Sequence, residues 1–259
     1  MILAIKESSM IHFWNGNKSA ARQAYEHQLL ELVLHHIGID EQVHNDMTDY
    51  PNADDEGAVL DNGADLLVTV AGNRKFMGRD FIEVPTPLCK GLLGWRVPII
   101  HHSRQGEFAH MSEDELKQQC VGVPNTWVDA ELFRHNGYNV KEKGSLAEML
   151  TWLAQGKVDF LTLGANEADE VLQQYDTHTA SLMIEPTKAL RYSFPVVFYV
   201  NSSQPQLAMQ LEQGLKIIIN NGCFDQLFIQ HFAKVLKAVD MESRDSIALE
   251  NPLLPMIYR

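Results

Sequence analysis

The chain has 259 residues, of which 45% are hydrophobic and 21% are charged. This composition is typical of a globular protein and excludes the disordered, collagen-like and coiled-coil classes. The 34 acidic residues outnumber the 21 lysines and arginines and give a net charge of −13, whereas a nucleic-acid-binding surface needs basic patches. We therefore expect no nucleic-acid partner, and at roughly 150 residues per domain the length predicts one or two domains.

The start of the chain and its cysteines bear on its location. No apolar run approaches the roughly 20 residues of a membrane-spanning helix, and residues 1–6 (MILAIK) lack the features of a signal peptide. We therefore expect either a cytoplasmic protein or a mature form whose leader has been removed. Cys89, Cys120 and Cys223 are widely spaced, and we expect three separate buried thiols rather than a disulfide framework or a metal knuckle.

Predicted strands and helices alternate through the first hundred residues. Short apolar runs predict strands at 2–6, 66–70, 81–84 and 92–100. Apolar residues at helical spacing predict a helix at 21–37, which Gly38 ends, and a second helix is expected at 53–60.

The middle of the chain repeats this alternation. Ser112 with Glu115 and Ser145 with Glu148 have the spacing of capping boxes that begin helices. Further strands are predicted at 121–123, 138–142 and 158–163, and a further helix at 126–136. Strands that alternate with helices predict βαβ units and mainly parallel sheets.

In the last third of the chain, the sequence predicts a strand, two helices and an extended arm. The strand is expected at 194–200, the helices at 205–220 and 223–237, and the arm at 251–255, where two prolines exclude a regular helix. Residues 63–69 and 156–162 share one pattern, a glycine that leads into an apolar strand, and this internal similarity suggests two lobes of similar build.

Several segments together resemble the extracellular solute-binding proteins of the amino-acid type, family 3. They are KGLLGWR at 90–96, VGVPNTWVDAE at 121–131, GKVDF at 156–160, GANE at 164–167 and NPLLP at 251–255. Their order and spacing extend the resemblance over nearly the whole chain.

This resemblance implies an α/β protein with the type II periplasmic-binding-protein fold. In that fold two α/β lobes are joined by two hinge strands and close on a small solute. One lobe would hold residues 1–99 and 195–259, and the other residues 100–194. The crossings would be the apolar segments 93–101 and 192–200.

Ligands of open α/β sheets bind beyond the carboxyl ends of strands, and Asn125 and Thr126 follow one such end. They stand between a predicted strand and a helix start, where free N–H groups and the helix dipole favour a carboxylate. Simple capping of the helix by either residue needs no ligand and is the alternative.

Two arginines are candidates for binding a ligand carboxylate. Arg96 lies in an apolar stretch, where a guanidinium must find a carboxylate in the ligand or in the protein. The resemblance places a carboxylate-binding arginine near this point, and a structural salt bridge or a solvated arginine on an edge strand is the alternative. Arg74 follows the strand at 66–70 and is a second candidate, although its surroundings are also those of an exposed turn.

Other strand ends supply the remaining candidates. The resemblance places an acidic residue on a ligand amine near Asn166 and Glu167. Trp14 and Trp127 could stack on a ligand, and core packing is the alternative for each. Thr69, near the end of the strand at 66–70, completes the predicted set.

The sequence lacks the motifs of several other functions. The 11 histidines include no HExxH or comparable ligand spacing, and no phosphate-binding glycine motif or Gly-x-Ser-x-Gly elbow occurs. We therefore expect no metal site, no cofactor and no catalytic residue.

The resulting hypothesis is a monomeric receptor that captures an amino acid or a related carboxylate. The resemblance implies an ABC-type permease or a membrane receptor as partner and the periplasm as the location of the mature chain. Two alternatives stay open. One is an enzyme on the same fold with dehydratase-like acid–base chemistry, and the other is a sensing or interaction module without a transport role.

Overall fold

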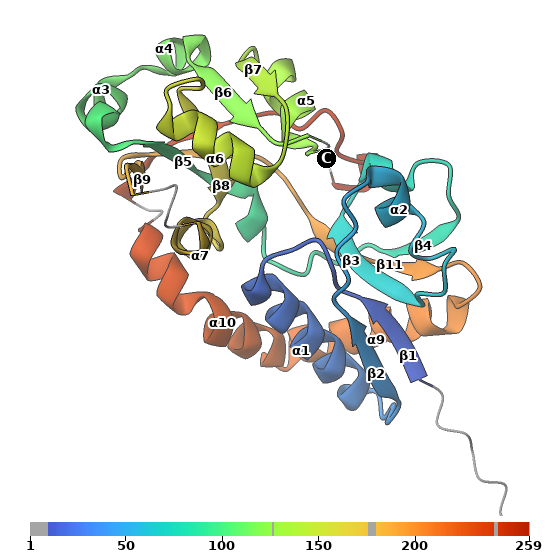
Figure 1. Ribbon diagram of the computed structural model, residues 1–259. Coiled ribbons are helices and arrows are strands. Elements are labelled where there is room, and N and C mark those ends of the chain that lie inside the picture. Colours follow the sequence, from blue (N-terminus) through green and yellow to red (C-terminus); the bar gives the residue numbers. More distant parts are fainter. Residues whose placement is uncertain (1–9, 126, 176–179, 241–242, 259) are drawn as a thin grey trace, which may run out of the picture. The chain divides into compact units, whose positions relative to one another are not determined.

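The computed structural model describes residues 10–125, 127–175, 180–240 and 243–258. It divides into two compact units, and each unit contains one sheet (Figure 1). The first unit comprises Met1–Val70, Lys75–Leu88 and Val197–His231, and the second comprises Ala71–Arg74, Cys89–Val196 and Phe232–Arg259. This division differs from the expected one chiefly at the C-terminus, because residues 232–259 go with the second unit.

The first unit is built on a five-stranded sheet. Its strands, in spatial order, are β2 (Gln42–Asp46), β1 (Met10–Trp14), β3 (Leu66–Val70), β11 (Val196–Asn201) and β4 (Phe81–Val84). β1 is parallel to β2 and to β3, whereas β11 is antiparallel to β4. The carboxyl ends of the first three strands therefore meet at one edge of the sheet.

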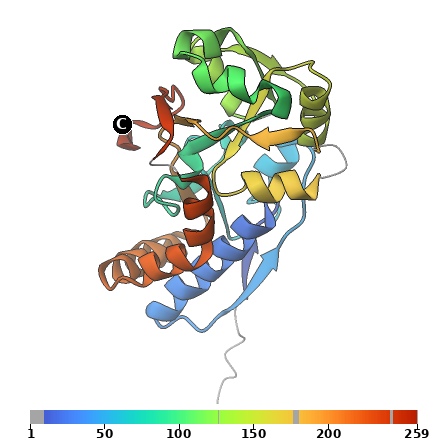
Figure 2. The ribbon, with the colours of Figure 1, turned by 90° about the vertical axis from the view of Figure 1, so that its left-hand side faces the viewer.

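Helices of the first unit cover this sheet. They are α1 (Ala20–His36), α2 (Ala53–Gly57), α9 (Pro205–Asn220) and α10 (Cys223–Val239), the last of which continues into the second unit. α1 and α9 pack against each other (Figure 2). Their close approach requires Gly214, where an added Cβ would lie 2.7 Å from a side-chain carbon of Val33.

The sequence explains why α1 forms where it does. Ser19 is its N-cap and accepts a hydrogen bond from the backbone N–H of Arg22. Tyr25, Leu29 and Val33 recur at helical spacing and are fully buried. The structure therefore confirms the helix predicted at 21–37.

The second unit is built on a seven-stranded sheet. Six strands lie, in spatial order, as β12 (Asp245–Ala248), β10 (Lys188–Arg191), β5 (Trp95–His101), β8 (Phe160–Gly164), β6 (Cys120–Val123) and β7 (Asn139–Glu142), and β9 (Leu182–Ile184) also pairs with β5. β6 is parallel to β7 and β8, and β5 is antiparallel to β8, β9 and β10. The sheet is thus mixed, with a parallel part as the sequence predicted.

Five short helices described in the second unit join or flank its strands. They are α3 (Gln105–His110), α4 (Glu113–Gln118), α5 (Asp129–His135), α6 (Leu146–Ala154) and α7 (Ala168–Gln174). Both predicted capping boxes are present, because Ser112 and Glu115 at the start of α4, and Ser145 and Glu148 at the start of α6, exchange reciprocal hydrogen bonds.

Some elements differ from the sequence predictions. The C-terminal tail, expected with the first lobe, adds strand β12 to the second sheet, where Asp245 is the register partner of Lys188. β1 and β2 were not predicted, because His12, His44 and Asp46 interrupt their apolar pattern. The strand predicted at 2–6 lies outside the described residues. No helix in the described ranges has the length and hydropathy needed to span a membrane.

Candidate functional site

The second sheet brings the ends of three strands to one edge. β8 runs parallel to β6 and antiparallel to β5, so β6 and β8 end at the edge where β5 begins. Arg96, the second residue of β5, is the register partner of Gly164, the last residue of β8. Side chains that follow β6 and β8 can therefore converge on Arg96, at the carboxyl edge where open α/β sheets bind ligands.

Arg96 is the centre of a buried polar cluster. Its side chain is 5% exposed, and its Nη2 lies 2.9 Å from Oδ1 of Asp129, whose side chain is 6% exposed. The Nε of Arg96 donates a hydrogen bond of 2.6 Å to the hydroxyl oxygen of Tyr192. That hydroxyl in turn donates a short hydrogen bond to Oδ1 of Asp129. The three side chains thus form a closed set of charge-assisted hydrogen bonds.

The surroundings of this cluster set its protonation states. Burial by itself would lower the pKa of Arg96, but Asp129, Tyr192 and Glu167 outweigh burial and raise that pKa above its ordinary value. Burial and the charge of Asp129 raise the pKa of Tyr192 well above 10.0. Arg96 is therefore a permanent cation, and Tyr192 is a neutral hydroxyl that donates to one partner and accepts from the other.

Two further side chains come from the loop between β8 and α7. Oε1 of Glu167 lies 3.8 Å from Nη1 of Arg96. Asn166 is only 3% exposed, and neither polar atom of its side chain has a hydrogen-bond partner among the described residues. A buried polar group without a partner costs about 1–3 kcal/mol. A polar group of a bound ligand would remove this cost.

The conformation of this loop depends on the glycine that ends β8. A Cβ at Gly164 would lie 2.7 Å from Oδ1 of Asn166 and 3.0 Å from Oε1 of Glu167. Heavy atoms rarely approach so closely, so any other residue would displace both polar side chains. Gly164 therefore lets two polar side chains fold back over the end of the strand.

The loop between β6 and α5 meets the same edge of the sheet. Asn125 is exposed, and its backbone N–H donates a 2.8 Å hydrogen bond to the carbonyl of Gly144. Trp127 is half-buried, and Thr126 lies outside the described residues. Val128 is the N-cap of α5 and makes no side-chain cap. The first turn of α5 instead contributes Asp129 to the pair with Arg96.

Of the other predicted residues, Trp14 and Thr69 belong to the first unit and Arg74 belongs to the second. Trp14 ends β1 in the first unit, is 3% exposed, and donates from Nε1 to the carbonyl oxygen of Thr48 at 3.0 Å. Thr69, in β3, is 8% exposed. Arg74 is exposed and forms an ion pair of 2.6 Å with Glu131, near the start of α5.

Sequence reasoning missed two members of the cluster, Asp129 and Tyr192. Asp129 belongs to the helix predicted at 126–136 and Tyr192 to the predicted crossing at 192–200, but neither was among the predicted site residues. One sequence signal did point to a missing partner, because an arginine in an apolar stretch requires a carboxylate. The structural salt bridge, left open from the sequence as an alternative for Arg96, is what the structure contains.

The cluster can orient polar groups, but its components do not form an evident reactive centre. Its arginine is paired internally, and its tyrosine is held neutral by burial. In the part of the chain that the structure describes, no group of three or more His, Cys, Asp or Glu side chains is arranged to hold a metal ion.

Comparisons with known proteins identify the fold. No protein-family model matches the chain, and no curated protein matches it in sequence. An ancestral arginine-binding protein bound to arginine superposes with a TM-score of 0.58 at 15% identity, over 86% of this chain and 98% of that protein. A histidine kinase sensor domain similar to periplasmic binding proteins gives 0.60 at 14% identity, over 85% and 95% of the two chains.

A third similar structure comes from Streptococcus pneumoniae. It is an amino-acid ABC transporter substrate-binding protein bound to L-arginine, with a TM-score of 0.58 at 14% identity, over 90% of this chain and 98% of that protein. These likenesses show that the chain has the periplasmic-binding-protein fold of amino-acid-binding proteins and sensor domains. The fold predicted from the sequence is therefore confirmed.

Proposed function

We propose that the protein is a non-catalytic receptor for a small polar solute, an amino acid or a related carboxylate. The observation that carries this proposal is Asn166, a buried amide whose two polar atoms lack partners within the described residues, at the ligand-binding edge of an α/β sheet. The fold supports the same conclusion, because its relatives include proteins that bind amino acids.

The charges of the cluster favour a particular orientation of the solute. Asp129 already neutralises Arg96 at 2.9 Å, so the negative charge of Glu167 is the excess charge of the cluster. An ammonium or amide group of the solute would be attracted to Glu167 and to the carbonyl oxygen of Asn166. In this proposal Arg96 acts mainly through its neighbours, by holding Asp129 and Glu167 in place.

The remaining predicted residues complete the proposed site. They would supply aromatic stacking, hydrogen bonds and a cation for the solute carboxylate, and they are Trp14, Thr69, Arg74, Asn125, Thr126 and Trp127. The proposed mechanism is that of the fold, in which the solute stabilises a closed state because it binds that state more tightly than the open one.

The proposed partner is a membrane protein that recognises the closed, solute-bound state. It would be an ABC-type permease or a sensor, since similar structures include a transporter's substrate-binding protein and a histidine kinase sensor domain. The proposed location is the periplasm or the cell exterior, and the proposed state is a monomer.

Thermal unfolding with a panel of solutes tests the proposal. Arginine and glutamine come first, because an ancestral protein of the same fold binds each of them. A ligand at 100 times its Kd stabilises the folded chain by about 2.7 kcal/mol, so the correct solute will raise Tm by several degrees without being consumed. If no amino acid or carboxylate changes Tm, or if product accumulates, the receptor proposal is wrong.

Variants locate the site. Glu167→Gln removes the excess negative charge and is expected to weaken binding of an amino acid at least tenfold. Glu170→Gln, three residues further along in α7, makes the same chemical change and should leave affinity unaltered. Equal affinities of the two variants would place the solute elsewhere.

A further inference from the structure

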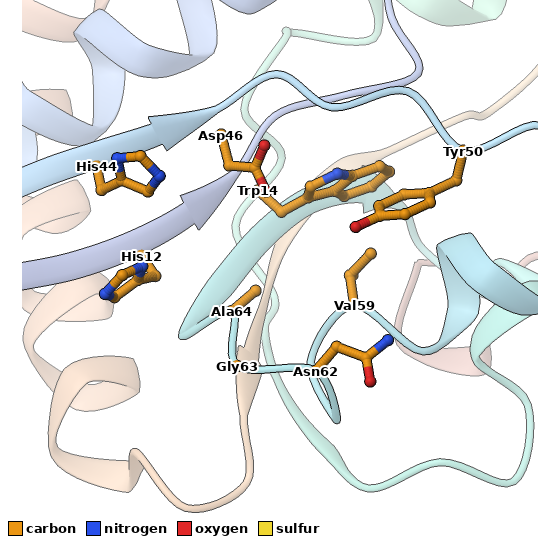
Figure 3. A pocket seen from close by; sticks show the side chains of 9 residues that line it. All are labelled: His12, Trp14, His44, Asp46, Tyr50, Val59, Asn62, Gly63 and Ala64. Atoms are coloured by element: carbon orange, nitrogen blue, oxygen red, sulfur yellow. The ribbon is translucent and has the colours of Figure 1, made fainter.

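The first unit contains a cavity of about 120 Å³ against its own sheet (Figure 3). Strands β1 and β2 contribute four of its lining side chains, and the segment from α2 to β3 covers the other side. The lining residues are His12, Trp14, His44, Asp46, Tyr50, Val59, Asn62, Gly63 and Ala64. Except for Trp14, none of these residues belongs to the proposed solute site.

The register of the sheet places two histidines side by side. His12 and His44 are register partners on the parallel strands β1 and β2, so both side chains project from the same face. Figure 3 shows the two imidazoles next to each other, with Trp14 and Asp46 one step further along the strands. The ring centroids of the two histidines are 5.3 Å apart, in an edge-to-face arrangement of 65°.

This spacing suits two ligands of one metal ion. A Zn–N bond is about 2.0–2.1 Å long, and an imidazole nitrogen lies about 1.15 Å from its ring centre, so each centroid would be about 3.2 Å from a shared ion. If each ring turns one nitrogen toward the shared ion, the observed separation of 5.3 Å corresponds to an N–Zn–N angle of about 110°, which is close to the tetrahedral geometry of zinc.

The two imidazoles are also available for coordination. Both histidines are exposed, and neither ring makes a hydrogen bond or ion pair with another described side chain or backbone group. This is not true of His36, whose Nδ1 lies 2.9 Å from the carbonyl oxygen of Leu32.

Asp46 supplies negative charge in the same cavity. The hydroxyl of Thr48 donates a 2.6 Å hydrogen bond to Oδ1 of Asp46. Oδ2 receives no hydrogen bond from the described residues. The cavity therefore contains a carboxylate and two imidazoles, a combination that favours a cation over an anion.

We propose that His12 and His44 form a binding site for a borderline divalent metal ion, Zn²⁺ or Ni²⁺. The two imidazoles are its protein ligands, water fills the other coordination positions, and Asp46 acts from beyond the coordination shell. Imidazole nitrogen is a preferred ligand of both ions. Outer carboxylates support such sites by orienting bound groups and offsetting the charge of the ion.

Isothermal titration of the full chain with ZnCl2 at pH 7.5, in a non-chelating buffer, tests this site. The expected result is one saturable site per chain. His12→Gln and His44→Gln each remove a direct ligand, so each is expected to weaken binding by more than the roughly 10–100-fold known for loss of outer-shell groups. Titration with NiCl2 should rank the variants by metal affinity in the same order.

The other histidines of the chain provide matched controls. His101 and His102 are neighbours with ring centroids 4.8 Å apart, and the double variant His101→Gln, His102→Gln should bind Zn²⁺ like the unaltered chain. Thermal unfolding without metal checks that each variant is folded, and both strand histidines are exposed enough to tolerate glutamine. The proposal is overturned if the chain shows no saturable zinc binding, or if folded His12→Gln and His44→Gln variants bind as tightly as the unaltered chain.

Discussion

Replacement of Asp129 by asparagine tests the central feature of the second unit. The change keeps the shape of the side chain but leaves the Arg96 guanidinium, 5% exposed, without its partner at 2.9 Å. Breaking a buried ion pair by removing one charge costs about 3–5 kcal/mol. Because Glu167 still lies 3.8 Å from Arg96, we expect the lower end of this range, about 3 kcal/mol. In a chain of this size that corresponds to a fall in Tm of roughly 6–12 °C.

A matched control lies two residues away in the same helix. Glu131 forms an ion pair with Arg74, but the side chains of these residues are 38% and 54% exposed. Pairs at such a surface contribute about 0–1 kcal/mol, so Glu131→Gln should lower Tm by no more than a few degrees. Thermal and urea unfolding, followed by circular dichroism, measure both variants. If Asp129→Asn and Glu131→Gln lose the same small amount of stability, the buried cluster does not hold the unit together as we argue.

Three other predictions follow from local geometry. Gly72→Ala should destabilise the chain by more than Gly78→Ala, because both glycines have a φ near +77° but only at Gly72 would a Cβ lie 2.6 Å from a carbonyl oxygen; equal Tm values would contradict this. Ser145→Ala removes one half of a capping box and should cost about 1 kcal/mol in urea unfolding, whereas Ser145→Thr should cost much less. Thr48→Val should raise the pKa of Asp46 toward 3.8, since the Thr48 hydroxyl is what chiefly lowers it. The stability that ionised Asp46 contributes above pH 3.8 should then disappear at a higher pH in the variant than in the unaltered chain during acid titration. Carboxyl NMR titration measures the pKa in both proteins.

Much of the fold could be predicted from the sequence because the signals are local. Apolar spacing and the Ser19 cap identify α1, and the two Ser–Glu capping boxes identify α4 and α6. Strands β3, β5 and β8 are continuous apolar runs between turn signals. Where strands carry polar residues, as at His12 and His44, the apolar pattern is broken and the prediction failed.

The candidate site shows the same limit. The sequence identified Arg96 and Glu167 as members of one site, and the structure places their charged groups 3.8 Å apart. It did not identify the groups that pair with Arg96, because Tyr192 is 96 residues away in the chain and nothing local marks it as a partner. The tail was misplaced for a similar reason, since the short strand β12 contains too few apolar residues to show which sheet it joins.

The amino-acid sequence by itself determined the alternation of strands and helices, the ends of several helices, and the need of a buried guanidinium for a carboxylate. These features depend on forces between residues that are near neighbours in the chain. Only the tertiary structure decided that Asp129 and Tyr192 meet that need, that Asn166 is buried without partners among the described residues, and that His12 stands beside His44. Each of these follows from strand register and burial, which arise when distant segments pack together and which no local pattern encodes.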